Sequence, residues 1–223
     1  AARPKVMDAG DIRDLIRWHA EAAKRAEAAG FDILYVYSGM GYLPYQFLLS
    51  DYNSRTDGYG GSVRNRVRLT EELIDAVRNA TGGRCAVALR MSMQELRARP
   101  SEVAESEAHE VVGLLRDAPD LFDVKMDYSA FDCSPSRFSG EGSHEATVDF
   151  MKKVTDKPVV GVGRFTSPDT MVSMVKRGVL DLIGGARPSI ADPFLPQKID
   201  HGREAEIREC IGCNICISSW HDG

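Results

Sequence analysis

Hydrophobic positions follow two alternating periods along the chain. Apolar residues that recur every three or four positions predict amphipathic helices, the first of them capped by Asp8 or Asp11. These helices cover residues 11–29, 68–80, 101–117, 144–155 and 168–177. Short apolar runs typical of buried strands lie between and after them, at residues 31–37, 86–91, 121–126, 158–162 and 180–184. Strands that alternate with helices predict a parallel sheet with right-handed crossovers.

The order of these elements distinguishes between two α/β folds. A dinucleotide-binding Rossmann sheet has G-x-G-x-x-G after a strand, and the sequence lacks this motif. The pattern fits the C-terminal part of a (β/α) TIM barrel of eight strands, about strands four to eight. In that fold the chemistry lies where strands end and loops begin, so the candidate site residues are expected there.

Composition and charge narrow the function classes. The chain has 28 Lys plus Arg against 33 Asp plus Glu, a net charge of -5, which argues against nucleic acid as the main partner. No apolar run reaches the roughly 20 residues of a membrane-spanning helix, and the start carries no secretory signal. We therefore expect a cytoplasmic protein. The chain lacks an initiator Met and stops just after a dense cysteine motif, so we interpret it as a fragment of a longer protein.

The last two predicted strands each end in glycine followed closely by arginine. Gly163 and Arg164 follow one strand, and Gly185, Ala186 and Arg187 follow the next. Small residues let backbone N–H groups approach an anion closely, and the arginines add positive charge. The loops after strands seven and eight are the usual phosphate site of a barrel, so we predict phosphate binding here. The alternative is that the glycines serve tight turns and the arginines pair on the surface.

Three of the five cysteines form the motif C-x-x-C-x-x-C, at Cys210, Cys213 and Cys216. Cysteines at this spacing share a metal more readily than a disulfide, and the spacing is typical of a [4Fe-4S] cluster. Zinc usually needs a second, separated C-x-x-C pair, which the sequence lacks. We therefore expect a partial barrel over residues 1–200 and the start of a cluster-binding segment over residues 201–223.

Longer strings of residues give a family resemblance. The segment 55–69 carries R-T-D-G-Y-G-G-S and N-R-V-R-L, and the pattern continues through Arg90, residues 163–164 and residues 186–188. Together they resemble the old yellow enzyme family of FMN barrels, the NADH:flavin oxidoreductase/NADH oxidase type, over essentially the whole chain. Residues 187–198 and 207–218 resemble its multidomain, trimethylamine dehydrogenase-like branch. Within that branch, residues 39–42 and 219–223 are similar to the dimethylglycine-type demethylases.

The resemblance implies two cofactors, FMN and a [4Fe-4S] cluster. It implies that residues 163–164 and 185–187 hold the FMN phosphate, and that the fourth cluster ligand is a cysteine beyond Gly223; His221 is the alternative. Arg90 is similar to the family's cation near the flavin N1 and C2 carbonyl, where reduced flavin accumulates negative charge. The alternative for Arg90 is a buried salt bridge inside the barrel.

The same resemblance implies which residues face the substrate. Enoate-reducing members place a His-His or His-Asn pair over the flavin, and here Tyr37 and Met40 occupy those positions. The amine-oxidising branch has a tyrosine at the first position, which Tyr37 matches, and a histidine at the second, where Met40 departs. Asp132 is similar to the aspartate of that branch's relay; the alternative is a solvated loop carboxylate. Trp220 matches an aromatic wall that holds an alkylammonium, and its alternative is packing beside the cluster.

These implications converge on an amine dehydrogenase. We expect oxidative demethylation of a small methylated amine, with Tyr37 and Asp132 as catalytic residues and Met40 and Trp220 in the substrate pocket. Electrons would pass from FMN through the cluster to an acceptor protein, in a homo-oligomer. Two alternatives stay open. One is an NAD(P)H-dependent enoate or 2,4-dienoyl-CoA reductase, and the other is a non-catalytic electron-transfer barrel.

Overall fold

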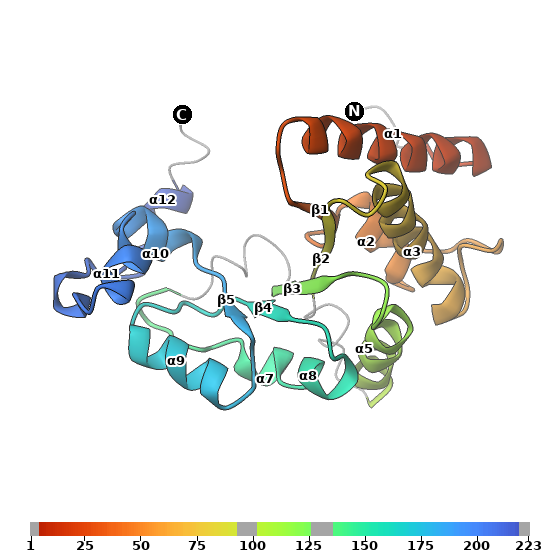
Figure 1. Ribbon diagram of the computed structural model, residues 1–223. Coiled ribbons are helices and arrows are strands. Elements are labelled where there is room, and N and C mark those ends of the chain that lie inside the picture. Colours follow the sequence, from red (N-terminus) through yellow and green to blue (C-terminus); the bar gives the residue numbers. More distant parts are fainter. Residues whose placement is uncertain (1–4, 93–101, 126–135, 219–223) are drawn as a thin grey trace.

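The structure, a computed structural model, describes residues 5–92, 102–125 and 136–218. Parallel strands form one sheet in it, and their spatial order follows their order in the chain (Figure 1). They are β1 (Ile33–Ser38), β2 (Ala86–Ser92), β3 (Leu121–Lys125), β4 (Val159–Gly161) and β5 (Leu182–Ile183). A doubly wound sheet reverses its strand order, whereas a barrel adds each strand beside the last. The predicted partial (β/α) barrel is therefore confirmed.

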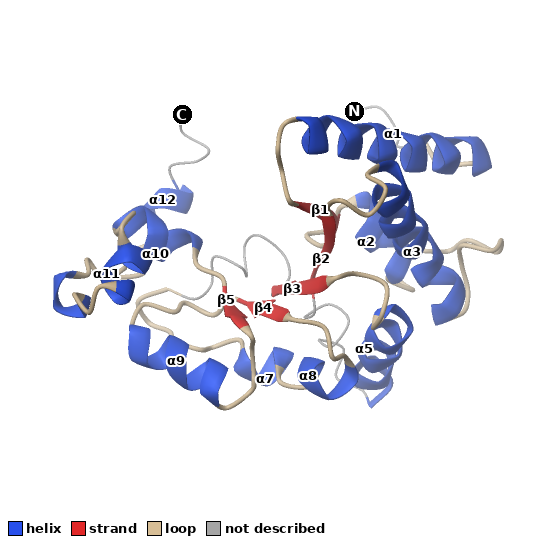
Figure 2. Cartoon of the chain, viewed as in Figure 1, coloured by secondary structure: helices blue, strands red, loops and turns tan. Residues whose placement is uncertain are grey.

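Helices cover the outer face of this curved sheet (Figure 2). The helices are α1 (Ala9–Ala28), α2 (Leu43–Leu48), α3 (Val63–Ala80), α5 (Glu102–Leu115), α7 (Glu145–Val148), α8 (Met151–Val154), α9 (Pro168–Lys176), α10 (Ala186–Ala191), α11 (Leu195–Asp200) and α12 (Ile215–Ser218). A short 3-10 turn spans Glu204–Glu206. No helix in the described part of the chain combines the length and the apolar character that crossing a bilayer requires.

The ends of the helices follow from local chemistry. Asp8 caps α1 and forms a capping box with Asp11, so both candidate capping residues take part. Ser62 caps α3, which begins five residues before the predicted segment 68–80. The predicted helix over residues 144–155 is wrong as one element, because it divides into α7 and α8. At the break Phe150 is buried and stacks on His109, with ring centroids 4.4 Å apart.

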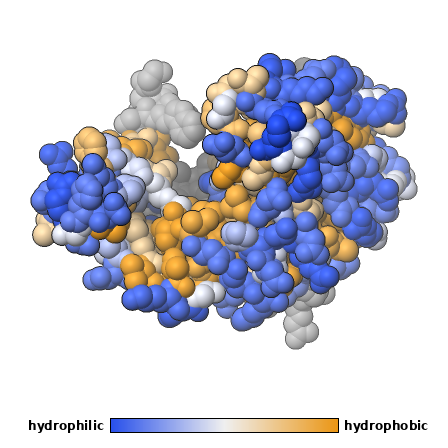
Figure 3. Space-filling view, viewed as in Figure 1, coloured by the Kyte–Doolittle hydropathy of each residue, from blue (hydrophilic) through white to orange (hydrophobic). Residues whose placement is uncertain are grey.

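Alternate strand residues separate a buried core from the open inner face. The side chains packed between sheet and helices are Val36, Val87, Leu89, Phe122 and Val124. On the inner face, by contrast, Tyr35 is 51% exposed and Leu182 is 50% exposed. Figure 3 shows apolar side chains gathered on this view over β4, β5 and α9. The outer face of the sheet is thus apolar and covered by helices, whereas the inner face mixes exposed apolar side chains with polar and charged ones.

The family-like motif between β1 and α3 fastens a loop to itself. Asn53 Nδ2 donates to the backbone carbonyls of Phe47 and Tyr59, both at 2.7 Å. Arg66 Nε donates to the carbonyl of Leu48 at 2.7 Å. These bonds satisfy buried carbonyl groups that a long loop would otherwise leave unpaired. The polar residues of this motif therefore have a structural role in shaping the exit of β1.

A glycine in this loop provides a test of its packing. A Cβ added to Gly60 would overlap the backbone carbonyl of Arg55, whereas a Cβ added to Gly113 in α5 would meet nothing within 4 Å. We expect Gly60→Ala to lower the free energy of unfolding of the full-length protein by roughly 1–3 kcal/mol. Gly113→Ala should leave it unchanged or raise it by about 0.5–1 kcal/mol. Urea denaturation followed by circular dichroism measures both, and equal effects of the two variants would contradict the tight loop.

Candidate cofactor and substrate site

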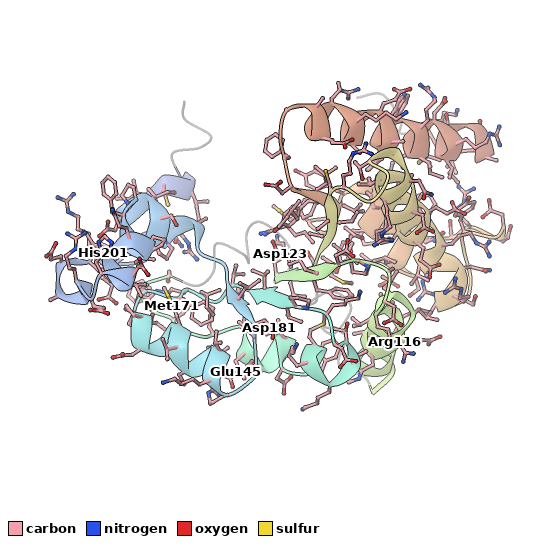
Figure 4. All side chains as sticks on the ribbon, in the orientation of Figure 1. Arg116, Asp123, Glu145, Met171, Asp181 and His201 are labelled. Atoms are coloured by element: carbon pink, nitrogen blue, oxygen red, sulfur yellow. The ribbon has the colours of Figure 1, made fainter. Side chains whose placement is uncertain are left out.

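The parallel register brings two predicted site residues and one unpredicted residue into a single row. Tyr37 of β1 pairs with Arg90 of β2, and Arg90 pairs with Asp123 of β3. Arg90 Nη1 donates to Asp123 Oδ2 across the two strands. Figure 4 labels Asp123 on the concave side of the sheet, across the strands from Glu145 and Arg116 in the helical layer. The row therefore faces the interior of the barrel.

Asp123 is one of the residues that sequence reasoning missed. Its side chain is 5% exposed, against 36% for that of Arg90. Burial raises the pKa of Asp123, and the positive charge of Arg90 and its hydrogen bond oppose that rise. An aspartate within an otherwise apolar strand was the available signal, because a buried carboxylate requires a partner.

The two interpretations of Arg90 are compatible. The structure shows the interior salt bridge to Asp123, and it also leaves about a third of the Arg90 side chain exposed. A guanidinium has five N–H donors in a rigid fork, so one bond to Asp123 leaves others for a ligand. Asp123 consequently fixes the position of the cation while the rest of the guanidinium lies at the accessible inner face.

The loop after β1 folds over the end of β2. Met40 has a left-handed backbone with φ of 54°, an uncommon conformation for a residue other than glycine. Its N–H donates to Ser92 Oγ at 3.3 Å, and a Cβ added to Gly39 would lie 2.6 Å from the same oxygen. The rings of Tyr37 and Tyr42 are tilted by 60° with centroids 5.5 Å apart. This loop therefore places Tyr37 and Met40 at the same mouth of the barrel.

The two predicted phosphate loops lie side by side at this edge. The N–H of Gly184, just after β5, donates to the carbonyl of Gly161 at the end of β4, at 2.8 Å. Arg164 has a left-handed φ of 59°, and its Nη1 donates to the carbonyl of Ser139 at 2.6 Å. Its Nε is buried and has no hydrogen-bond partner among the described residues. Gly185 caps α10, whose first N–H groups lack partners within the helix.

A half-buried carboxylate holds the first of these loops in place. Glu141 accepts hydrogen bonds from the backbone N–H groups of Thr166 and Ser167 and from the hydroxyl of Thr170. Burial raises the pKa of Glu141, but these hydrogen bonds outweigh it and lower the pKa to about 2. The carboxylate thus stays charged at any physiological pH and fixes the chain just after Arg164.

His144 lies beneath the same loops as a neutral side chain. Burial, together with the charges of Arg187 and Lys125, lowers its pKa to about 4, although the Val162 backbone acts in the opposite direction. The Nδ1 atom is buried and without a partner among the described residues. Neither His144 nor Lys125 was predicted as a site residue. Lys125 is buried on β3 and pairs in register with Ser92 of β2.

The cysteine motif follows as an irregular loop that runs into α12, which contains Cys216. Cys210 is half-buried, Cys213 and Cys216 are exposed, and all three thiols are free. Within the described residues, no three His, Cys, Asp or Glu side chains converge as a metal site. The [4Fe-4S] assignment therefore stays a prediction. Two further predicted site residues, Asp132 and Trp220, lie outside the described residues.

Comparison with known proteins identifies the family. Residues 1–206 match the NADH:flavin oxidoreductase / NADH oxidase family. The chain belongs to this family. Dimethylamine dehydrogenase of Hyphomicrobium sp. (strain x) is 40% identical over 219 residues, which cover 97% of this chain and 30% of that protein. The chain thus spans about a third of the length of such relatives.

Solved structures of flavin oxidoreductase relatives have the same fold. A 6-hydroxypseudooxynicotine amine oxidase from Pseudomonas geniculata N1 matches with a TM-score of 0.90 and 54% identity, over 97% of this chain and 32% of that one. Histamine dehydrogenase from Rhizobium sp. 4-9 matches with a TM-score of 0.90 and 45% identity, over 98% and 32%. NADH oxidase of Thermoanaerobacter brockii is 31% identical in sequence, over 96% of this chain and 33% of its own length.

The buried, neutral His144 predicts acid sensitivity. Its pKa is about 4 in the folded protein against 6.5 for an unperturbed histidine, so between these values the unfolded state binds more protons. The free energy of unfolding should therefore fall as the pH is lowered from 6.5 to 4, by up to about 3 kcal/mol from this group. His144→Gln should remove that part of the slope. Urea midpoints measured across this range check it, and parallel profiles for the two proteins would contradict it.

Proposed function

We propose that the chain is part of an FMN- and [4Fe-4S]-dependent oxidoreductase that oxidatively demethylates a small methylated amine of the trimethylamine or dimethylglycine type. The row of Tyr37, Arg90 and Asp123 carries this proposal, because it sets a phenol beside a fixed cation on the open inner face. The dimethylamine dehydrogenase, the histamine dehydrogenase and the amine oxidase are 40% to 54% identical to the chain, whereas the NADH oxidase is 31% identical. The proposal favours amine oxidation for that reason.

The residues present fit FMN. Arg164 offers a buried Nε without a partner among the described residues, next to the glycine-rich ends of β4 and β5, as a phosphate requires. Arg187 opens α10 on the neighbouring loop. Arg90 lies on the inner face, where its exposed N–H groups would meet the N1 and C2 carbonyl side of the ring. When bound, FMN supplies a two-electron acceptor for hydride.

The chain's own groups then have separate tasks. Tyr37 binds and orients the amine nitrogen and, with Asp132, holds the proton that a protonated amine must lose before it can donate hydride. Arg90 stabilises negative charge, and Asp123 keeps the guanidinium in place. Loss of hydride from the N-methyl group leaves an iminium, and water hydrolyses the iminium to formaldehyde and the demethylated amine. We assign Met40 and Trp220 to the walls of this pocket.

The cysteine loop is the proposed route for electrons. Cys210, Cys213 and Cys216 would hold three irons of a [4Fe-4S] cluster. Free thiols at three-residue spacing supply the soft ligands that such a cluster takes. The loop turns at left-handed residues on both sides of Cys213, so the chain can wrap around a ligand. An electron-transfer protein is the expected acceptor.

A visible spectrum of the anaerobic full-length protein tests the substrate class. Dimethylamine or dimethylglycine should bleach the flavin band without any pyridine nucleotide. In Tyr37→Phe the rate of bleaching should fall about a hundredfold, because a positioned proton-transfer group contributes at least that much. Tyr52→Phe, at a tyrosine that is 66% exposed, is the matched control. If NADH alone bleaches the flavin and an enone restores it, the reductase alternative is correct. If the flavin responds to neither the amine nor NADH, the remaining alternative is the non-catalytic electron-transfer barrel.

Iron analysis tests the cluster. Cys213→Ala in the full-length protein should lose most of its iron and the absorbance of the cluster, while flavin supplied in excess still binds. Cys85→Ala is the control, because Cys85 is buried at the start of the sheet with its Sγ 3.2 Å from the carbonyl of Phe31. Retention of a full iron complement by Cys213→Ala would contradict the assignment.

A further inference from the structure

The cysteine loop contacts a phosphate-loop arginine through a residue that has no role in metal binding. Arg187 Nη1 donates to the side-chain oxygen Oδ1 of Asn214 at 2.5 Å, between residues 27 apart in the chain. Asn214 stands directly after Cys213 in the motif. A hydrogen bond from a charged donor is stronger than one between neutral groups, so it orients the guanidinium. The amide of Asn214 therefore fixes Arg187 from the side of the cysteine loop.

A second contact joins the same loop to the other phosphate-loop arginine. Gly212 directly precedes Cys213, and a Cβ added to it would lie 2.8 Å from Arg164 Nε and 2.7 Å from the backbone nitrogen of Arg137. The carbonyl of Gly212 accepts a hydrogen bond from that nitrogen at 2.9 Å. Only glycine fits at position 212, because the cysteine loop packs directly against the guanidinium of Arg164.

The backbone conformation makes these contacts depend on the loop's shape. Gly212 has φ of 66° and Asn214 has φ of 61°, so both neighbours of Cys213 are left-handed. Asparagine tolerates this conformation better than other residues with a side chain. A change in how Cys213 is held would rotate the two residues that touch Arg164 and Arg187.

We propose that Asn214 is a positioning residue that couples the cysteine loop to the grip of Arg187 on the cofactor phosphate. This inference rests on the proposed function, which places FMN at these arginines and a cluster on these cysteines. A loop fixed by its cluster holds Arg187 in place before FMN arrives, which reduces the cost of ordering the side chain on binding. The coupling is reciprocal, so bound FMN also favours the loop conformation that holds the cluster.

The proposed coupling changes only the binding of the flavin phosphate, so two flavins that differ in that group can measure it. FMN and riboflavin share the ring and the ribityl chain and differ only in the phosphate group. Loss of the Asn214 contact should weaken the affinity for FMN about tenfold and leave the affinity for riboflavin unchanged. A general loosening of the fold would weaken the affinity for both flavins.

The experiment titrates flavin-free, full-length protein with FMN and with riboflavin, followed by quenching of flavin fluorescence. Asn214→Gly is the test variant, because glycine keeps the left-handed backbone and removes only the side chain. Ile211→Ala, at a loop residue that is 68% exposed, is the matched control. Cys213→Ala should show the same FMN-specific loss, and the double variant should lose no more than either single one, since both act through Arg187.

The possible results distinguish failure of the coupling from failure of the proposed function. An unchanged ratio of FMN to riboflavin affinity in Asn214→Gly, or an equal loss for both flavins, overturns the coupling while leaving the proposed function intact. Wild-type protein that takes up neither flavin nor iron overturns both. If Asn214→Gly does not fold, the wild-type protein before and after removal of its iron gives the same ratio, and no change on removal overturns the coupling.

Discussion

The parallel register of the sheet is the constraint on which the site depends. Because each strand pairs with the next in chain order, side chains at the same level form rows across the inner face, and Tyr37, Arg90 and Asp123 occupy one of them. A shift of one residue in any strand would turn its member of the row toward the helices. A buried carboxylate is costly without a partner, so the ion pair between Arg90 and Asp123 also favours this register over its neighbours.

The loops at the carboxyl end of the sheet are held by polar side chains that bind the loop backbone and do not line the interior of the barrel. Glu141 fixes the chain after β4 through backbone N–H groups, and Asn53 and Arg66 fasten the loop after β1 through backbone carbonyls. Within the family-like motif between residues 55 and 69, Arg55, Asn65 and Arg68 also donate to backbone carbonyls. A recognisable motif is therefore not always a ligand site, and here its polar residues shape the loop after β1.

Local pattern was enough to predict the strands, the barrel class and the glycine-arginine loops, because each depends on residues close together in the chain. The division of the helix over residues 144–155 depends on packing of Phe150 against His109, which no local pattern reveals. The pairs Arg90 with Asp123 and Arg187 with Asn214 join residues 33 and 27 apart. Such partners become visible only once the register and the loop path are known, so Asp123 and Asn214 were missed.

Charge at the site also constrains the form in which an amine can react. The chain has a net charge of -5, yet Arg90, Arg164 and Arg187 all lie at one edge of the sheet, and the neighbouring His144 is held neutral. This local positive charge suits a phosphate and a reduced flavin, but it repels an alkylammonium ion. Simple amines, like the lysine side chain with its pKa near 10.4, are protonated at neutral pH. In the proposed reaction a protonated amine must therefore lose its proton before it can donate hydride, and Tyr37, beside Arg90 in the row, is the described residue to which the proposal gives that task.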